Sequence, residues 1–150
     1  MAVLSLSLLF GNGMREDRLP LSRPRLRRLI LATLPAGCST AHITVVIVGA
    51  AEGKRLNAAF RKKSYATNVL TFDYSPPPDI AADVVLCHPV VQQEAKASRK
   101  PLDHHYAHLI VHGVLHACGL DHQNGADADR MEALEAAILR RFRISDPYLH

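Results

Sequence analysis

The stretch HGVLHACGLDH, residues 112–122, carries three histidines, at positions 112, 116 and 122. His112 and His116 are four residues apart, so a helix would place them on one face, one turn from each other. An unbroken helix would carry His122 about 15 Å along its axis from His112, because each residue rises ~1.5 Å. The chain must therefore turn back after His116, and Gly119 accepts the positive φ that ends many helices. The stretch predicts a helix that ends in a glycine turn and brings three imidazoles together.

Three neutral imidazoles without an evident fourth ligand are typical of a catalytic zinc site rather than a structural one. We expect one Zn²⁺ per chain, or another divalent transition metal, on His112, His116 and His122. His108 would lie about 12 Å from His116 along a helix, so we expect it to be a neighbour of the site or a core residue. Cys118 should point away from the site and pack as a small hydrophobe.

The segments around this stretch alternate between strand and helix signals. Periodicity and turn residues predict strands over about residues 2–10, 42–50, 67–74 and 82–87, and helices over about 22–34, 51–61, 88–98, 102–118 and 126–142. We therefore predict an α+β fold in a single domain, residues 1–150. It should hold a small mixed sheet of about four strands, about five helices and a metzincin-like metal-binding helix and turn.

Composition limits the classes of function. The chain has 18 Lys and Arg against 14 Asp and Glu, a net charge of +4, which permits an anionic partner without requiring one. Cys38, Cys87 and Cys118 are scattered and odd in number, which favours a reducing compartment over a disulfide framework.

The apolar opening MAVLSLSLLF lacks a basic start and alternates serine with leucine, so it favours a strand over a signal peptide. No apolar run reaches ~18 residues, so we expect no membrane span and a cytoplasmic protein.

The histidine spacing also matches the metzincin peptidase pattern H-E-x-x-H-x-x-G-x-x-H, except that Gly113 replaces the glutamate that serves as general base. Peptide hydrolysis needs such a base to pass a proton to the leaving amine. Three neutral ligands leave the metal its full charge, which suits a phosphodiester, whose transition state gathers negative charge on oxygen. The stretch thus favours phosphodiester chemistry, with the 2′-hydroxyl of RNA or a water molecule as nucleophile.

Several segments resemble one known family. HGVLHACGLDH is similar to the HGxLHxxGYDH signature of the bacterial YbeY family of metal-dependent endoribonucleases. LNAAFRKKSYATNVLTFDY (56–74) resembles that family's LNxxYRxKDxPTNVLSF segment, and ADVVLC (82–87) resembles its GDxxIC strand. The resemblance covers about residues 42–148. The chain departs from the family pattern at Ser64, Ala66, Ala82, Leu120 and Gly49-Ala50, none of which is a proposed metal ligand.

The resemblance implies a single-strand-specific endoribonuclease that acts in small-subunit rRNA maturation and ribosome quality control. It implies zinc or a similar divalent ion on His112, His116 and His122, and an important arginine at Arg61. The planar, permanently charged guanidinium of Arg61 suits phosphate binding. The expected partners are single-stranded RNA and small-subunit rRNA or the ribosome, with neither DNA nor a membrane expected.

Two alternative functions and two weaker features stay open. The chain could be a metallopeptidase-like hydrolase, or a non-enzymatic ribosome-assembly factor in which the metal is structural. The basic stretch RPRLRR (23–28) could bind rRNA phosphates or form a solvated helix face. Asp121 could orient a histidine or cap the turn after Gly119.

Overall fold

The computed structural model of the chain describes residues 2–61, 67–120 and 124–149, apart from the side chains of Phe60 and Arg61. The strands are β1 (Val3–Phe10), β2 (Thr40–Val48), β3 (Val69–Ser75) and β4 (Asp79–Cys87). The helices are α1 (Arg23–Thr33), α2 (Ala50–Arg61), α3 (His88–Ala97), α4 (Leu102–Ala117) and α5 (Gly125–Arg140), with a short 3₁₀ turn at Glu16–Arg18. The predicted α+β class is confirmed, and the predicted elements agree with these bounds to within a few residues.

The strands form one mixed sheet in the order β1-β2-β4-β3. β1 pairs with β2 and β2 pairs with β4 in parallel, while β3 runs antiparallel to β4. Three prolines, at 76–78, make the short connection between β3 and β4. Because β1, β2 and β4 are parallel, their carboxyl ends share one edge of the sheet, and α2 and α3 begin there.

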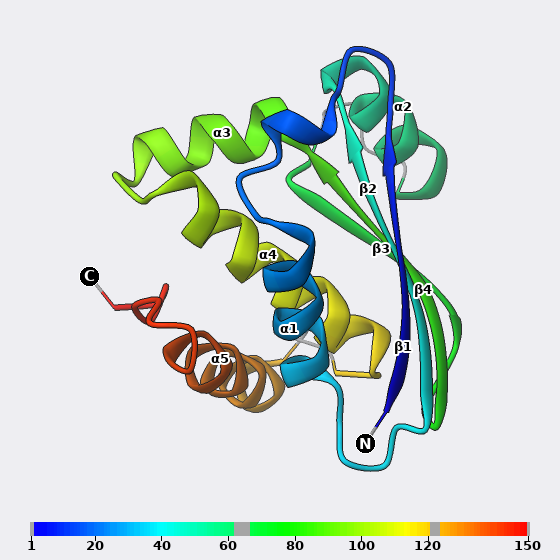
Figure 1. The fold of residues 1–150 in the computed structure, drawn as a ribbon. Coiled ribbons are helices and arrows are strands. Elements are labelled where there is room, and N and C mark those ends of the chain that lie inside the picture. Colours follow the sequence, from blue (N-terminus) through cyan, green and yellow to red (C-terminus); the bar gives the residue numbers. More distant parts are fainter. Residues whose placement is uncertain (1, 62–66, 121–123, 150) are drawn as a thin grey trace.

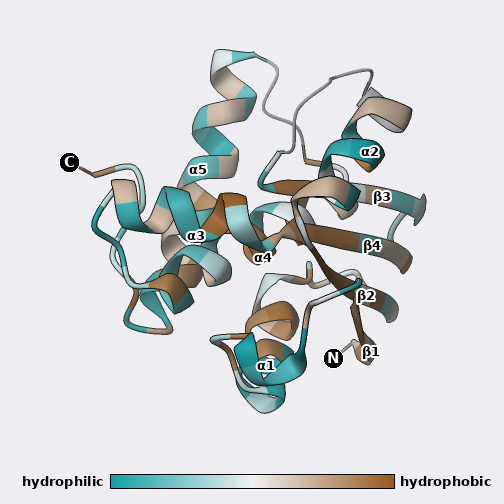
Figure 2. Cartoon of the chain, turned by 90° about the horizontal axis from the view of Figure 1, so that it is seen from above, coloured by the Kyte–Doolittle hydropathy of each residue, from teal (hydrophilic) through white to brown (hydrophobic). Residues whose placement is uncertain are grey.

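The two faces of the sheet are covered by different helices and bury apolar cores of different size. α1, α4 and α5 lie on one side of the sheet and enclose the main core, while α2 lies on the other side (Figure 1). β1 shows the predicted alternation, since Leu4 and Leu8 are buried while Ser5 and Ser7, which lie between them in sequence, are exposed. Figure 2 shows apolar residues concentrated in the strands and in α4.

Close packing of α4 on the sheet depends on Gly113. A Cβ at this position would lie 2.8 Å from Val84 Cγ1 and 3.1 Å from Thr71 Oγ1. The Thr71 hydroxyl donates a hydrogen bond to the Gly113 carbonyl, at 3.3 Å. The absence of a side chain therefore lets the helix backbone approach β3 and β4 directly.

α4 ends as its sequence predicts, at a glycine turn. Gly119 has a φ of +97°. Its N–H donates to the His116 carbonyl at 3.0 Å, and the Leu120 N–H donates to the Leu115 carbonyl at 3.1 Å. This pair of bonds closes the helix.

One detail of the predicted packing is wrong. The apolar residues of 51–61 predict that Leu56, Ala59 and Phe60 face inward from α2, but Ala59 is exposed and the Phe60 side chain lies outside the described structure. Gly53 and Asn57 are buried instead, with Leu56 half-buried. An apolar pattern on so short a helix cannot reveal that a glycine and an amide side chain make its inner face. No helix in the described residues is long and apolar enough to span a membrane.

Candidate metal centre

His112 and His116 lie side by side on one face of α4. Their ring centroids are 4.8 Å apart and their planes are inclined by 77°. Both side chains are half-buried, near the end of the helix that the Gly119 turn closes. Two imidazoles on consecutive turns therefore converge as the spacing predicts, which is an arrangement that can supply two nitrogen ligands to one ion.

A buried carboxylate from α5 supports this pair. Glu135 is 0% exposed. Its oxygens lie 3.3 and 3.4 Å from His112 Nδ1 and 2.8 Å from His108 Nε2. A carboxylate only accepts hydrogen bonds, so His112 donates through Nδ1 and carries its lone pair on Nε2. This is the tautomer that metal-binding histidines adopt when a carboxylate orients them.

The charge of Glu135 is maintained by its donors. Burial raises the pKa of this carboxyl group, but the hydrogen bonds from His108 and His112 outweigh burial and lower the pKa from 4.5 to about 2. The Tyr148 hydroxyl adds a third donor at 2.9 Å. Burial and the nearby charge of Glu135 raise the pKa of Tyr148, so its hydroxyl keeps the proton that it donates.

A second carboxylate joins α4 to the start of β3. Glu94 on α3 lies 2.9 Å from His105 Nε2 and accepts a hydrogen bond from Asn68 Nδ2 at 3.1 Å. Asn68 directly precedes β3, the strand against which Gly113 packs. Glu94 thus positions α4 relative to the segment that leads into β3.

The remaining predicted site residues are Arg61, Asp121 and His122, and the structure describes them only in part. Arg61 is the last residue of α2, with its side chain outside the description. His122 and Asp121 also lie outside the described residues, among which no group of three His, Cys, Asp or Glu side chains could hold a metal. The three-histidine ligand set and the role of Arg61 therefore stay predictions.

His108 and Cys118 lie where the sequence suggests. His108 contacts Glu135 and so borders the His112–His116 pair. Cys118 is half-buried against the main core, and burial raises the pKa of its thiol to about 11. Neither residue shows an arrangement typical of a ligand.

Two residues around the histidine pair, Glu135 and Tyr148, are not predicted from the sequence. One signal was available for Glu135, because it lies in an otherwise apolar stripe of α5 with Met131, Ile138 and Leu139, all of them buried. A carboxylate on the core face of a helix must have buried donors. Tyr148 lies in an irregular C-terminal segment, where no periodicity marks a buried side chain.

Comparisons with known proteins agree with the predicted resemblance. The model of the family described as Endoribonuclease YbeY matches residues 22–143. Endoribonuclease YbeY of Thiobacillus denitrificans is 52% identical over 147 residues, which cover 97% of this chain and 96% of that protein. Endoribonuclease YbeY of Paracidovorax citrulli is 51% identical over 148 residues, which cover 97% of this chain and 95% of that protein.

A solved structure shows the same fold. The solution structure of TM1509 from Thermotoga maritima superposes with a TM-score of 0.61 at 20% identity, covering 97% of this chain and 100% of that one. The family model spans most of the chain, and the relatives share about half of its residues over nearly their full length. The chain therefore belongs to the YbeY family of endoribonucleases.

Proposed function

We propose that this chain is a metal-dependent endoribonuclease that cuts single-stranded RNA during small-subunit rRNA maturation and ribosome quality control in the cytoplasm. The observation that supports a metal centre most is the pairing of His112 and His116 beside the buried Glu135. A buried carboxylate on Nδ1 of the first histidine suits an imidazole that must present Nε2 to an ion. His122, the third histidine of the motif, completes the proposed ligand set, with zinc as the expected ion.

In this proposal, the histidines, Glu135 and Arg61 have different roles. His112, His116 and His122 would hold the divalent ion, which when bound supplies Lewis-acid charge to a phosphodiester. Glu135 would hold His112 in one orientation and one tautomer. Arg61, at the end of α2, would place a permanent charge against the reacting phosphate and stabilise the negative charge that develops there.

Gly113 argues against peptidase chemistry at this site. It occupies the position where metzincins carry their catalytic glutamate, yet it faces the sheet, where even a Cβ would lie 2.8 Å from Val84 Cγ1 and force a neighbour to shift. A glutamate here would have no room in this packing of α4. Proton transfer to a leaving amine would then lack its usual base.

One experiment tests the ligand set and the arginine together. Metal content and cleavage of a single-stranded RNA are measured on the wild type, His116→Ala and Arg61→Ala. The His116→Ala protein should lose both tight metal binding and cleavage. Arg61→Ala should keep its metal and lose roughly 10²- to 10³-fold in rate, the usual effect of removing one transition-state charge contact.

Two outcomes would contradict the proposal. Full metal occupancy in His116→Ala would mean that the ligand set is wrong. Wild-type cleavage by Arg61→Ala at equal metal content would make Arg61 a solvated surface residue.

A further inference from the structure

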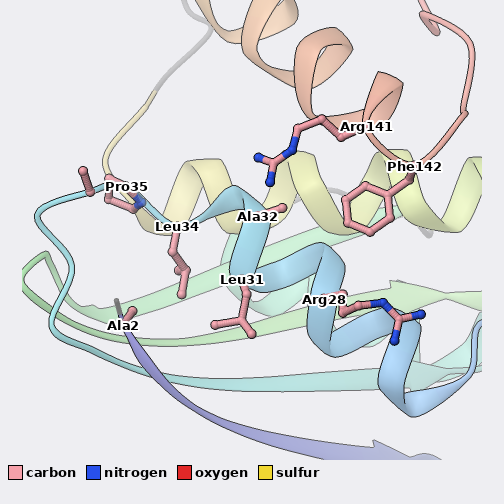
Figure 3. Close-up of a pocket in the computed structure, with 9 residues that line it drawn as sticks. Ala2, Arg28, Leu31, Ala32, Leu34, Pro35, Arg141 and Phe142 are labelled. Carbon is pink, nitrogen blue, oxygen red and sulfur yellow. The ribbon is translucent and has the colours of Figure 1, made fainter.

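A cleft lies between α1 and the end of α5, away from the histidines. It has a volume of about 450 Å³, within the range of ligand-binding pockets. Leu31 of α1 and Leu34, just after α1, line one wall, and Arg141 and Phe142, just after α5, line the other (Figure 3). Arg28 of α1 also lines this cleft. Its surface thus combines an apolar wall with two guanidinium groups.

The positive charges of the two cleft arginines are not neutralised by carboxylates of the described residues. Arg28 and Arg141 are exposed, and neither forms an ion pair with a carboxylate in the part of the chain that the structure describes. Other exposed arginines differ, since Arg15 pairs with Asp17 at 2.9 Å and Arg55 pairs with Glu52 at 3.3 Å.

The two segments that form the cleft are rich in arginine and contain no acidic residues. Residues 18–51 contain no aspartate or glutamate, and neither do residues 136–145. The arginines of these segments that belong to α1 and to the end of α5 are Arg23, Arg25, Arg27, Arg28, Arg140, Arg141 and Arg143. Of these, Arg28 and Arg141 line the cleft, whereas Arg23 at the start of α1 is paired with Glu16.

The cleft is held in shape by Arg25. Its Nη2 donates to the Phe142 carbonyl at 3.3 Å, and its guanidinium carbon lies 5.9 Å from the centre of the Phe142 ring. This contact fixes the end of α5 against α1 and keeps the half-buried Phe142 at the cleft wall. A flat apolar group could enter such a pocket without rearranging the helices.

We propose that this cleft anchors the single-stranded RNA substrate outside the histidine centre, with a nucleobase against the apolar wall and backbone phosphates on Arg28 and Arg141. Bases stack on aromatic and apolar side chains, and guanidinium groups pair with phosphates, so one nucleotide matches both parts of the cleft. The proposal rests on RNA being the substrate, as proposed above.

The proposed RNA anchor, which is the cleft of Arg28 and Arg141, and the histidine centre lie toward the two outer strands of the sheet, β1 and β3. Ala2, which also lines the cleft, directly precedes β1 at one edge, whereas α4 packs through Gly113 on β3 at the other. Three strand spacings of ~4.8 Å separate these edges by about 14 Å. Only an RNA of several nucleotides can reach both, so the cleft would favour long substrates over very short ones.

The test measures RNA binding by four proteins. They are the wild type, the cleft variant Arg28→Ala/Arg141→Ala, the charge-matched control Arg15→Ala/Arg55→Ala, and Arg28→Lys/Arg141→Lys. Fluorescence anisotropy follows a labelled single-stranded RNA of about twelve nucleotides, within the range of ~4–16 that single-strand binding sites cover. The titration is done in chelator at several salt concentrations, with the RNA shown to be intact afterwards, and circular dichroism confirms that each variant is folded.

The cleft variant should bind roughly tenfold more weakly than the wild type, and its plot of log affinity against log salt should be shallower by about 1.4, since each phosphate contact in a single strand contributes ~0.7. The lysine variant should keep the wild-type slope because it keeps both charges. The control should resemble the wild type, because each removed arginine was already paired with a carboxylate.

The outcomes separate this proposal from the function on which it rests. If the wild type binds and cleaves RNA but the cleft variant equals the control in affinity and slope, the anchor is wrong and the endoribonuclease proposal stands. If the cleft variant loses binding of a polyglutamate peptide while its RNA binding is unchanged, the cleft serves an acidic protein instead. If the wild type neither binds nor cleaves RNA, the proposed function fails first and the anchor fails with it.

Discussion

Glu135 is the residue whose position says most about the histidine pair. A fully buried carboxylate is costly unless several donors surround it, and His108, His112 and Tyr148 supply them. One carboxylate can thus orient His112 and remain ionised without contacting the proposed ion. Its contact with His112 Nδ1 links a residue 23 positions away in sequence to the proposed metal centre.

We expect Glu135→Gln to weaken metal binding by about 10- to 100-fold, the usual effect of replacing a group that orients a histidine ligand. The amide keeps the volume of the side chain but can no longer fix the proton on Nδ1 of His112. Isothermal titration of the apo protein with Zn²⁺ measures this change. Asp129→Asn is the control, because Asp129 is an exposed carboxylate on the same helix. Equal affinities in the two variants would remove Glu135 from the metal centre.

Sequence pattern predicts some residues around the histidine pair and not others. The turn after His116 was predictable because few residues besides glycine adopt positive φ, and Gly119 stands where the spacing needs a reversal. The burial of Glu135 could be suspected from the apolar stripe around it on α5, but its contact with His112 could not, because helix periodicity does not show which residue of another helix a side chain meets. The end of the predicted ligand set, His122, lies outside the described residues, so its position stays a prediction.

At the scale of elements, α4 packs on β3 and β4 through a bare backbone. We expect Gly113→Ala to lower the free energy of unfolding by about 1–3 kcal/mol, because the new Cβ would meet Val84 Cγ1 at 2.8 Å. Helix propensity alone predicts the opposite sign, a gain of about 1 kcal/mol. Urea denaturation of chelated protein decides between them.

Gly125→Ala is the matched control for this substitution. Gly125 begins α5 and is exposed, and a Cβ at this position would point into open space, with no neighbouring atom within 4 Å. Alanine there should leave stability unchanged or raise it slightly. If Gly113→Ala is as stable as Gly125→Ala, α4 does not need its close approach to the sheet.

The contact between α4 and α5 should make stability sensitive to acid. The pKa of Glu135 falls from 4.5 to about 2 on folding, so its contribution is complete above about pH 4.5 and is lost as the pH falls toward 2. The size of this contribution is on the order of 3 kcal/mol. Urea denaturation of the metal-free protein at several pH values should show this loss in the wild type and a flatter profile in Glu135→Gln. Parallel profiles would mean that other carboxyl groups cause the acid sensitivity.

At the scale of the whole molecule, the fold brings together charges that the sequence keeps apart. The basic stretch RPRLRR has two open interpretations from sequence, phosphate binding or a solvated helix face, and the structure adds specific places for two of its arginines. Arg25 is used to hold Phe142, a residue 117 positions away, while Arg28 lines a cleft with Arg141. No local pattern could join these segments, because only the packing of α1 against α5 makes them neighbours.

Two features from different parts of the molecule favour RNA over polypeptide as the substrate. The histidine spacing is metzincin-like, but Gly113 faces the sheet and the positive cleft suits a polyanion. We therefore expect a metal-loaded preparation to cut single-stranded RNA and to leave a disordered polypeptide intact, because an amine leaving group still needs a delivered proton. Both substrates are incubated with the wild type and His112→Ala, with and without chelator, and the products are separated on gels. Chelator-sensitive proteolysis that His112→Ala loses, without RNA cleavage, would make the chain a peptidase. Cleavage of neither substrate by metal-loaded protein would favour an assembly factor whose metal only stabilises the turn after α4.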